Sequence, residues 1–263
     1  MKKISQKIYF GVIMVFLYLP LIYLIAYSFN DGKTSVWKGF TLKWYEALFN
    51  DAQIMGSLKN TLIIAILASV ISTVLGTFAA IGIYNFKGGV RSAIWNISNI
   101  PIINPEIVTG VSLMLLFTFA GVMMGFEMGF WTVLLAHIGF CTPYVILNVT
   151  PRIRQMDSSL YEAALDLGWS PVQAFFKVVL HELLPGIFAG FLISFTYSLD
   201  DFVITYFTRG SRFQTLPVQI YTMTHQRINP KANALSALLF VAIIAILIIY
   251  NIASIRRSKE EAR

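Results

Sequence analysis

Long runs of apolar residues constrain this sequence more than any other feature. A helix needs about 20 mostly apolar residues to cross the hydrocarbon core of a bilayer. Six runs reach that length: Ile8–Phe29, Leu58–Tyr84, Ala93–Phe119, Gly129–Val149, Gly186–Phe207 and Asn233–Ile255. Within a membrane a helix satisfies its own backbone hydrogen bonds, which a lone strand cannot do. The sequence therefore predicts an all-α, polytopic membrane protein of about six transmembrane helices, in a single domain over residues 1–263.

The composition supports this prediction. Charged residues make up 13% of the chain and hydrophobic residues 57%, whereas a soluble globular protein carries about 25% charged residues. The first run follows Lys2, Lys3 and Lys7, so the alternative is a cleaved signal peptide. The run is too long for the apolar region of a signal peptide and has no small-x-small cleavage site before Asn30. We therefore expect a retained helix.

Basic residues indicate the orientation. An even number of spans places both termini on one side, and the segments of that side hold twelve of the 20 lysines and arginines, against eight on the other side. Cytoplasmic segments carry the excess of Lys and Arg, and the first helix usually dominates. We expect a bacterial inner-membrane protein with both termini in the cytoplasm. The net charge of +7 then reflects topology and lipid contact, and nucleic acid is not expected as a partner.

No enzymatic motif is legible. The sequence has no G-x-x-x-x-G-K-[ST] phosphate-binding loop, so ATP binding through a P-loop is not expected. The three histidines, His137, His181 and His225, lie in different segments and have no metal-ligand spacing. No nucleophile and base are arranged for catalysis. We expect a transport subunit that is not an enzyme and binds no metal.

The longest inner stretch, about residues 150–185, contains the pattern of two helices joined at a glycine. Leu160–Leu167 is predicted to be a short helix that Gly168 ends in a left-handed conformation. Ser170 and Pro171 are then suited to the N-cap and first position of a second helix. Small Ala163 and Ala164 allow close approach of a partner, beside the carboxylate of Glu162. The alternative is an ordinary helix-turn-helix at the membrane interface.

This stretch resembles the EAA loop of ABC-importer permeases. The matching residues are Glu162, Ala163, Ala164, Gly168, Val178 and Leu180, located between the fourth and fifth of six spans as in that family. One residue departs from the pattern, because His181 stands where the family usually has proline. Gly39–Tyr45 and Ser57–Thr61 are similar to other segments of these permeases. Ser198–Phe202 and Asn229–Leu235 are most similar to the permease subunits of spermidine/putrescine importers.

The resemblance implies a type I ABC importer permease fold and a set of partners. In that family the EAA loop docks into the ATPase, so Glu162, Ala163, Ala164 and Gly168 are implied as coupling residues. The implied partners are a second permease subunit, a dimer of ATP-binding subunits and an extracytoplasmic solute-binding protein, besides the lipid bilayer. ATP and Mg are implied in the partner ATPase, and this chain itself holds no cofactor.

Carboxylates within the spans are candidates for the translocation pathway. Ionisable groups are costly in a membrane and mark either a pathway or a pairing. In the fifth run, polar residues recur at helical spacing: Ser194, Ser198, Asp201, Thr205 and Thr208. One continuous helix would place them on one face, with Asp200 about 100° away. A carboxylate can replace the lost hydration of a cationic amine, so Asp201 ranks first. The alternative is a polar stripe that packs between helices.

Four further residues complete the predicted pathway. Ser198 and Asp200 shortly precede Asp201 in the sequence, and Tyr197 is suited to a cation–π contact. The third run is interrupted by Pro101 and Pro105. Asn104, Pro105 and Glu106 are predicted as the N-cap and the first and second positions of a second half-helix. Broken helices occur at membrane depth where they line a cavity. Glu106 either lines that cavity or only complements the helix dipole.

The sequence as a whole indicates a permease subunit of an ATP-driven ABC importer. The predicted cargo is a small cationic solute, with a polyamine such as spermidine or putrescine as the leading candidate. The same machine carrying an amino acid, iron complex, sulfate or phosphonate is the alternative. An autonomous channel or secondary carrier belongs to another class, which would not need an EAA loop.

Overall fold

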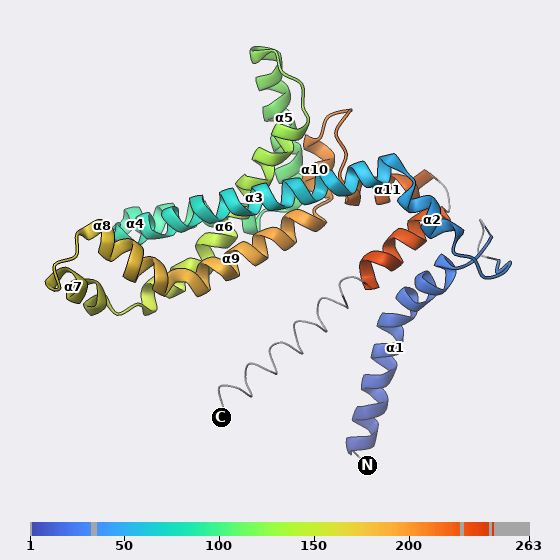
Figure 1. The fold of residues 1–263 in the computed structure, drawn as a ribbon, viewed down its shortest axis with the longest axis horizontal. Coiled ribbons are helices and arrows are strands. Elements are labelled where there is room, and N and C mark those ends of the chain that lie inside the picture. Colours follow the sequence, from blue (N-terminus) through green and yellow to red (C-terminus); the bar gives the residue numbers. More distant parts are fainter. Residues whose placement is uncertain (1, 33–35, 227–228, 242–243, 245–263) are drawn as a thin grey trace. The chain divides into compact units, whose positions relative to one another are not determined.

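The structure is a computed structural model that describes residues 2–32, 36–226, 229–241 and 244 (Figure 1). The chain divides into two compact units. One comprises Ser57–Val218, and the other comprises Met1–Gly56 with Gln219–Arg263. The described residues are predominantly helical in both units, and their only β feature is an isolated bridge between Asn30 and Phe40. The all-α prediction is confirmed.

The unit Ser57–Val218 holds most of the helices. They are α3 (Ala52–Asn85, whose first turn belongs to the other unit), α4 (Gly88–Ile103), α5 (Glu106–Met124), α6 (Phe130–Gln155), α7 (Ser158–Asp166), α8 (Pro171–Ala174), a π-helical turn (Phe175–Val179), α9 (Leu180–Asp200), α10 (Val203–Thr208) and the start of α11 (Leu216–Gln226). Within this unit α7 and α8 lie together at one end, beside the passage from α3 into α4 (Figure 1).

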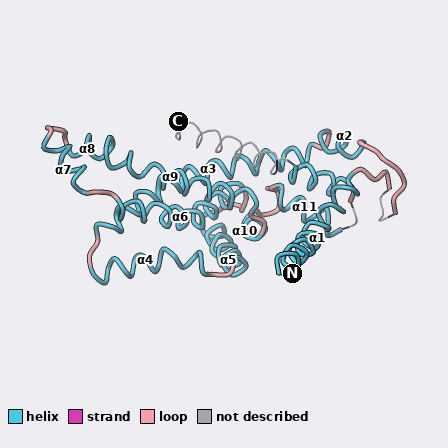
Figure 2. Tube along the Cα trace, turned by 90° about the horizontal axis from the view of Figure 1, so that it is seen from below, coloured by secondary structure: helices cyan, strands magenta, loops and turns pink. Residues whose placement is uncertain are grey.

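Helix α6 is central to the packing of this unit. It contacts α9, α4 and α10, and α3 packs against it in two apolar clusters. Val145 and Val149 of α6 are fully buried in the larger cluster, together with Ala80 of α3 and Leu183 of α9. Figure 2 shows α3, α6 and α9 side by side, with α4 flanking α6. This bundle supports the helix ends that form the candidate site.

The other unit contains α1 (Lys2–Ser28), α2 (Lys43–Phe49) and a helical segment at residues 230–241. The Trp44 indole donates to the Asn30 carbonyl oxygen at 2.8 Å, and Leu48 is buried beside it in α2. Lys231 pairs with Asp51 at 3.0 Å, and this hydrogen bond lowers the pKa of the Asp51 carboxyl. The ion pair ties the segment after α11 to the start of α3.

Five described helices are long and apolar enough to cross a membrane: Tyr9–Ser28, Ala52–Asn85, Glu106–Met124, Phe130–Gln155 and Pro171–Asp200. Most of the sixth expected span, Asn233–Ile255, lies outside the described residues. The third expected span, Ala93–Phe119, is broken at Asn104–Pro105 between α4 and α5, as the sequence predicted from Pro105. Pro101 lies within α4 and does not interrupt the helix, contrary to the prediction. The fifth expected span, Gly186–Phe207, ends early, since α9 stops at Asp200.

Candidate translocation site and coupling loop

Two helix breaks meet at a cavity of about 260 Å³ in the unit Ser57–Val218. One break separates α4 from α5, and the other separates α9 from α10. Gly110 of α5 allows α10 to approach closely, because a Cβ there would lie 2.8 Å from the Phe207 ring. The lining includes three carboxylates and four aromatic rings: Glu106, Asp200, Asp201, Phe140, Tyr144, Tyr197 and Phe202. None of the described lining residues is Lys or Arg.

The break before α5 differs in detail from the expected capping. Pro105 takes the N-cap position and Glu106 is the first helical residue, whereas the sequence predicted Asn104 as the N-cap. The Asn104 side chain instead donates to the Thr109 hydroxyl at 3.0 Å. Glu106 is exposed and lies in the first turn, where a carboxylate complements the positive end of the helix dipole. It therefore both lines the cavity and stabilises this half-helix.

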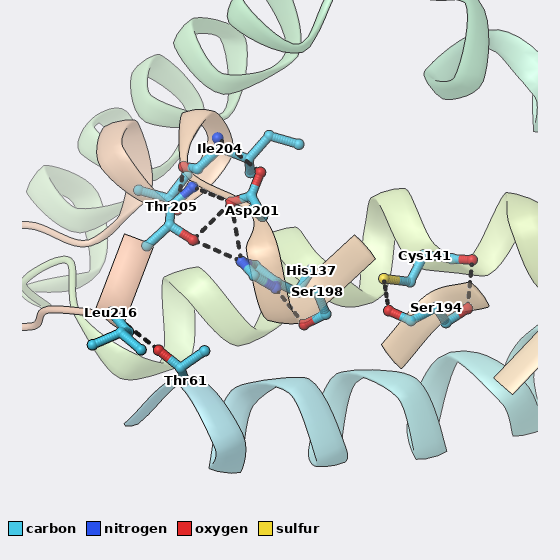
Figure 3. A network of polar contacts seen from close by, with 10 residues as sticks. Thr61, His137, Cys141, Ser194, Ser198, Asp201, Ile204, Thr205 and Leu216 are labelled. Atoms are coloured by element: carbon cyan, nitrogen blue, oxygen red, sulfur yellow. Dashed lines mark hydrogen bonds and ion pairs between the residues drawn. The ribbon is translucent and has the colours of Figure 1, made fainter. Parts of the chain in front are cut away.

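Asp201 is held in a buried hydrogen-bond network (Figure 3). One carboxylate oxygen, Oδ2, accepts from the Thr205 backbone N–H at 2.8 Å and from the Thr205 hydroxyl at 2.7 Å. The other, Oδ1, accepts from the Ile204 N–H at 3.3 Å. These N–H groups belong to the first turn of α10, so Asp201 caps that half-helix. Its side chain is only 6% exposed, and His137 Nε2 lies 3.5 Å from Oδ2.

His137 of α6 joins the two sides of the α9–α10 break. Its Nδ1 lies 2.7 Å from the Ser198 hydroxyl, and its Nε2 lies 2.9 Å from the Thr205 hydroxyl. If Thr205 donates to Asp201, its oxygen can accept from Nε2–H, which leaves Nδ1 as acceptor for Ser198. In this arrangement both ring nitrogens of His137 have a hydrogen-bond partner. Ser198 is buried in this network and does not line the cavity.

The five polar residues of the fifth run do not share one helix. Four of them, Ser194, Ser198, Thr205 and Thr208, are buried, but the helix breaks between Asp200 and Val203. An extended residue, Asp201 at ψ 125°, reorients the chain there. The expectation of one continuous polar face is therefore wrong, and these side chains serve packing and capping.

Asp200 has the opposite environment. It is the last residue of α9 and is exposed, and it lines the cavity together with Tyr197. Tyr197 stacks on Tyr144 of α6 with ring centroids 4.5 Å apart. The C-terminal end of a helix carries the negative pole of its dipole, so the end of α9 adds negative potential beside the exposed carboxylate of Asp200. Of the predicted pathway residues, Asp200, Tyr197, Glu106 and Asp201 meet at one cavity.

The loop between α6 and α9 has the local geometry that its sequence predicted. Gly168 adopts φ +85°, and two backbone bonds close the end of α7: Gly168 N–H to Leu165 O at 2.9 Å, and Trp169 N–H to Ala164 O at 3.1 Å. This pair of bonds is the Schellman motif. Ser170 and Gln173 form a reciprocal capping box, with Pro171 at the first helical position.

Two features of the loop were not predicted. Asp157 caps the start of α7 by accepting from the Ser159 N–H at 2.9 Å, and this bond lowers the pKa of the Asp157 carboxyl. The second helix is also not short. It continues from Pro171 through the π-helical turn into α9 as one span to Asp200. His181, which replaces the family proline, lies in the first turn of α9 without interrupting it.

The loop exposes a mixed apolar and acidic surface. Glu162 and Ala163 are exposed, whereas Ala164 is buried against the loop itself. Leu167 is 80% exposed and Val172 is 65% exposed. Contiguous exposed apolar side chains mark interaction sites. Of the expected coupling residues, Glu162, Ala163 and Gly168 are thus exposed, and none of them lines the cavity.

The sequence did not predict His137 of the hydrogen-bond network or the lining residues Phe140, Tyr144 and Phe202 as site residues. The histidines were considered only for metal-ligand spacing, and His137 lies more than 50 residues before its partners Ser198 and Asp201. A signal was present, because an ionisable residue inside a span is rare and usually has a partner. Tyr144 stands in an apolar run like any buried aromatic residue, so its sequence gives no such signal.

Comparisons with known proteins agree with this geometry. The chain is 36% identical to the spermidine/putrescine transport system permease protein PotC of Haemophilus influenzae, over 90% of this chain and 91% of that one. It is 38% identical to the putrescine transport system permease protein PotI of Escherichia coli, over 87% of this chain and 83% of that one.

Solved structures share the fold. One belongs to a bacterial ABC transporter involved in the import of the acidic polysaccharide alginate (TM-score 0.71, 16% identity, 96% of this chain and 95% of that one). Another belongs to the MetNI methionine ABC transporter in inward-facing conformations (TM-score 0.61, 19% identity, 83% of this chain and 99% of that one). Residues 72–256 match the family described as binding-protein-dependent transport system inner membrane component. The chain belongs to this family of multi-pass inner-membrane permeases, as a transport component of an ABC importer.

Proposed function

We propose that this chain passes a polyamine into the cell as one of two permease subunits of an ABC importer. The observation that carries the proposal is the cavity at the two helix breaks, which combines three carboxylates with four aromatic rings and has no basic lining residue. Carboxylates replace the hydration of ammonium groups, and aromatic faces attract cations and cover methylene chains. Both relatives named above are permeases of polyamine transport systems.

Within the cavity the two adjacent aspartates have different proposed roles. Asp200 is the primary ligand for the ammonium group, because its exposed carboxylate lies at the negative end of α9. Glu106 and Tyr197 complete the contact surface. Asp201 and Ser198 act as positioning residues, since their hydrogen bonds to Thr205 and His137 fix the break that presents Asp200.

The loop at Glu162, Ala163, Ala164 and Gly168 is proposed as the coupling element. The exposed Leu167 and Val172 offer apolar surface beside Glu162, which a groove of the ATP-binding subunit would cover. The proposed complex has a second permease subunit, two ATP-binding subunits that hold ATP and Mg, and an extracytoplasmic solute-binding protein. Rigid-body movement transmitted through this loop would alternate access to the cavity.

Uptake by the reconstituted complex tests the cargo. We expect labelled putrescine or spermidine to accumulate in proteoliposomes that contain external binding protein and internal ATP. Excess unlabelled polyamine should compete, whereas methionine, sulfate and a phosphonate should not, because the lining favours cations. Accumulation of one of those other solutes in place of polyamine would contradict the proposed cargo. Uptake that persists without the ATP-binding subunits would contradict the importer mechanism.

The proposed orientation places both termini and the α7–α8 loop in the cytoplasm. Cysteines introduced at the exposed Ser159 and Ser211 report on the two sides. In intact cells a membrane-impermeant thiol reagent should label Ser211→Cys and leave Ser159→Cys unlabelled until the membrane is opened. The native Cys141 is fully buried and should give no background. Labelling of Ser159→Cys in intact cells would reverse the orientation.

A further inference from the structure

A second cavity, of about 240 Å³, lies where α3 passes into α4 beside the C-terminal part of α6. Two arginines line it, Arg91 of α4 and Arg154 of α6, together with the hydroxyl residues Ser92 and Thr150. None of its described lining residues is acidic. This cavity is therefore suited to an anion, in contrast to the acidic cavity at the helix breaks.

Both guanidinium groups lie against aromatic rings, and neither has an acidic partner among the residues that the structure describes. The Arg91 guanidinium lies over the Tyr84 ring at 5.0 Å, and that of Arg154 lies over Trp95 at 5.9 Å. The ion pairs found among the described residues join other side chains. An aromatic contact uses the flat face of a guanidinium, so its N–H donors at the edge remain available. Those donors match the geometry of phosphate oxygens.

The surroundings of the cavity indicate a lipid rather than a soluble anion. Helix α4 begins at the end of the unit that carries α7 and α8 (Figure 1), and residues of its first turn line the cavity. Tyr84 and Trp95 are residue types that sit at the headgroup level of a bilayer. Along α4, Val90, Ile97 and Ile100 are each more than half exposed, and none of its residues is buried in this chain. A phospholipid could thus place its headgroup in the cavity and its acyl chains along α4.

We propose that Arg91 and Arg154 bind the headgroup phosphate of an anionic phospholipid. Basic pockets between transmembrane helices on the cytoplasmic side recognise such headgroups. The first turn of α4 reaches the same cavity through Gly88 and Arg91, and its dipole adds positive potential. With the orientation proposed above, the lipid belongs to the cytoplasmic leaflet. The site itself does not depend on that orientation or on the cargo.

The test compares lipid retention by the assembled complex with and without the two charges. The variant Arg91→Gln/Arg154→Gln keeps polar side chains of similar reach. The matched control, Lys59→Gln/Arg212→Gln, removes two exposed charges outside this cavity. Each complex is purified from mixed phosphatidylglycerol and phosphatidylcholine nanodiscs, and native mass spectrometry counts the lipids that remain bound. We expect the site variant to lose phosphatidylglycerol retention by roughly twentyfold relative to wild type, and the control to retain it.

Each other outcome overturns the proposal. Equal retention by the site variant and wild type would show that the arginines bind no lipid. If inorganic phosphate displaces the retained phosphatidylglycerol from wild type, a free anion is the ligand instead. If the site variant no longer copurifies with the ATP-binding subunits in detergent, the arginines are subunit contacts. Basal ATPase activity is measured in the same preparations. We expect it to be unchanged in the site variant, which would show that the complex is assembled when lipid is counted.

Discussion

Replacing Gly168 with valine is expected to cause a large loss of uptake while the protein remains in the membrane. Gly168 has φ +85° and closes α7 through its N–H bond to Leu165. A β-branched residue is a true outlier at positive φ, and such strain costs about 1–3 kcal/mol. The loop would relieve it by abandoning the Schellman turn, which would displace Glu162 relative to α8. We expect uptake to fall by at least about tenfold.

Two further variants separate coupling from folding. Gly168→Asn tolerates the left-handed conformation and should keep uptake within about twofold of wild type. Glu162→Lys leaves the backbone intact and reverses an exposed charge, so it should weaken assembly with the ATP-binding subunit and lower the ATPase response to loaded binding protein. Normal uptake in both Gly168→Val and Glu162→Lys would refute the coupling role of the loop.

The loop could be predicted from sequence because its determinants are local. A left-handed glycine, a serine cap and a proline at the first helical position act within a few residues of each other. Gly168, Ser170 and Pro171 accordingly take the predicted positions. The long apolar spans were legible for the same reason, since the thickness of a bilayer sets their length.

The candidate site could be predicted only in part, because its geometry depends on helix breaks and distant contacts. The Pro105 break leaves a signal in the sequence, since proline lacks the N–H of a helix interior. The break after Asp200 has no such residue. The chain turns there because Asp201 caps α10 and His137 bridges from α6, and neither interaction follows from periodicity. Helical spacing therefore predicts Asp201 on the pathway face and Asp200 on another face. In the structure Asp200 is the exposed aspartate of the cavity, and Asp201 is largely buried.

The two aspartates can be separated by isosteric substitution. Asp200→Asn should leave folding and assembly unchanged, because the exposed carboxylate of Asp200 contributes to the cavity rather than to packing. It removes the charge that a transiting ammonium group would meet, and a charged hydrogen bond is worth about 1.5–3 kcal/mol. We therefore expect kcat/KM for polyamine uptake to fall roughly 10- to 100-fold, with basal ATPase activity retained. Asp200→Glu, which keeps the charge, should recover part of the loss.

Asp201→Asn should act on stability instead. The amide oxygen of asparagine can still accept a hydrogen bond. Its NH₂ group, however, is a donor and would face the N–H donors of Ile204 or Thr205, which now bond to the two carboxylate oxygens. Losing the charged acceptor is expected to cost about 2–3 kcal/mol, seen as a lower thermal midpoint of the purified complex and less protein in the membrane. His137→Ala should show the same effect, because it leaves Ser198 and Thr205 without their shared partner. If instead Asp200→Asn transports polyamine at the wild-type rate while a fully stable Asp201→Asn complex does not, Asp201 is the ligand, and the division of roles read from the hydrogen-bond network is wrong.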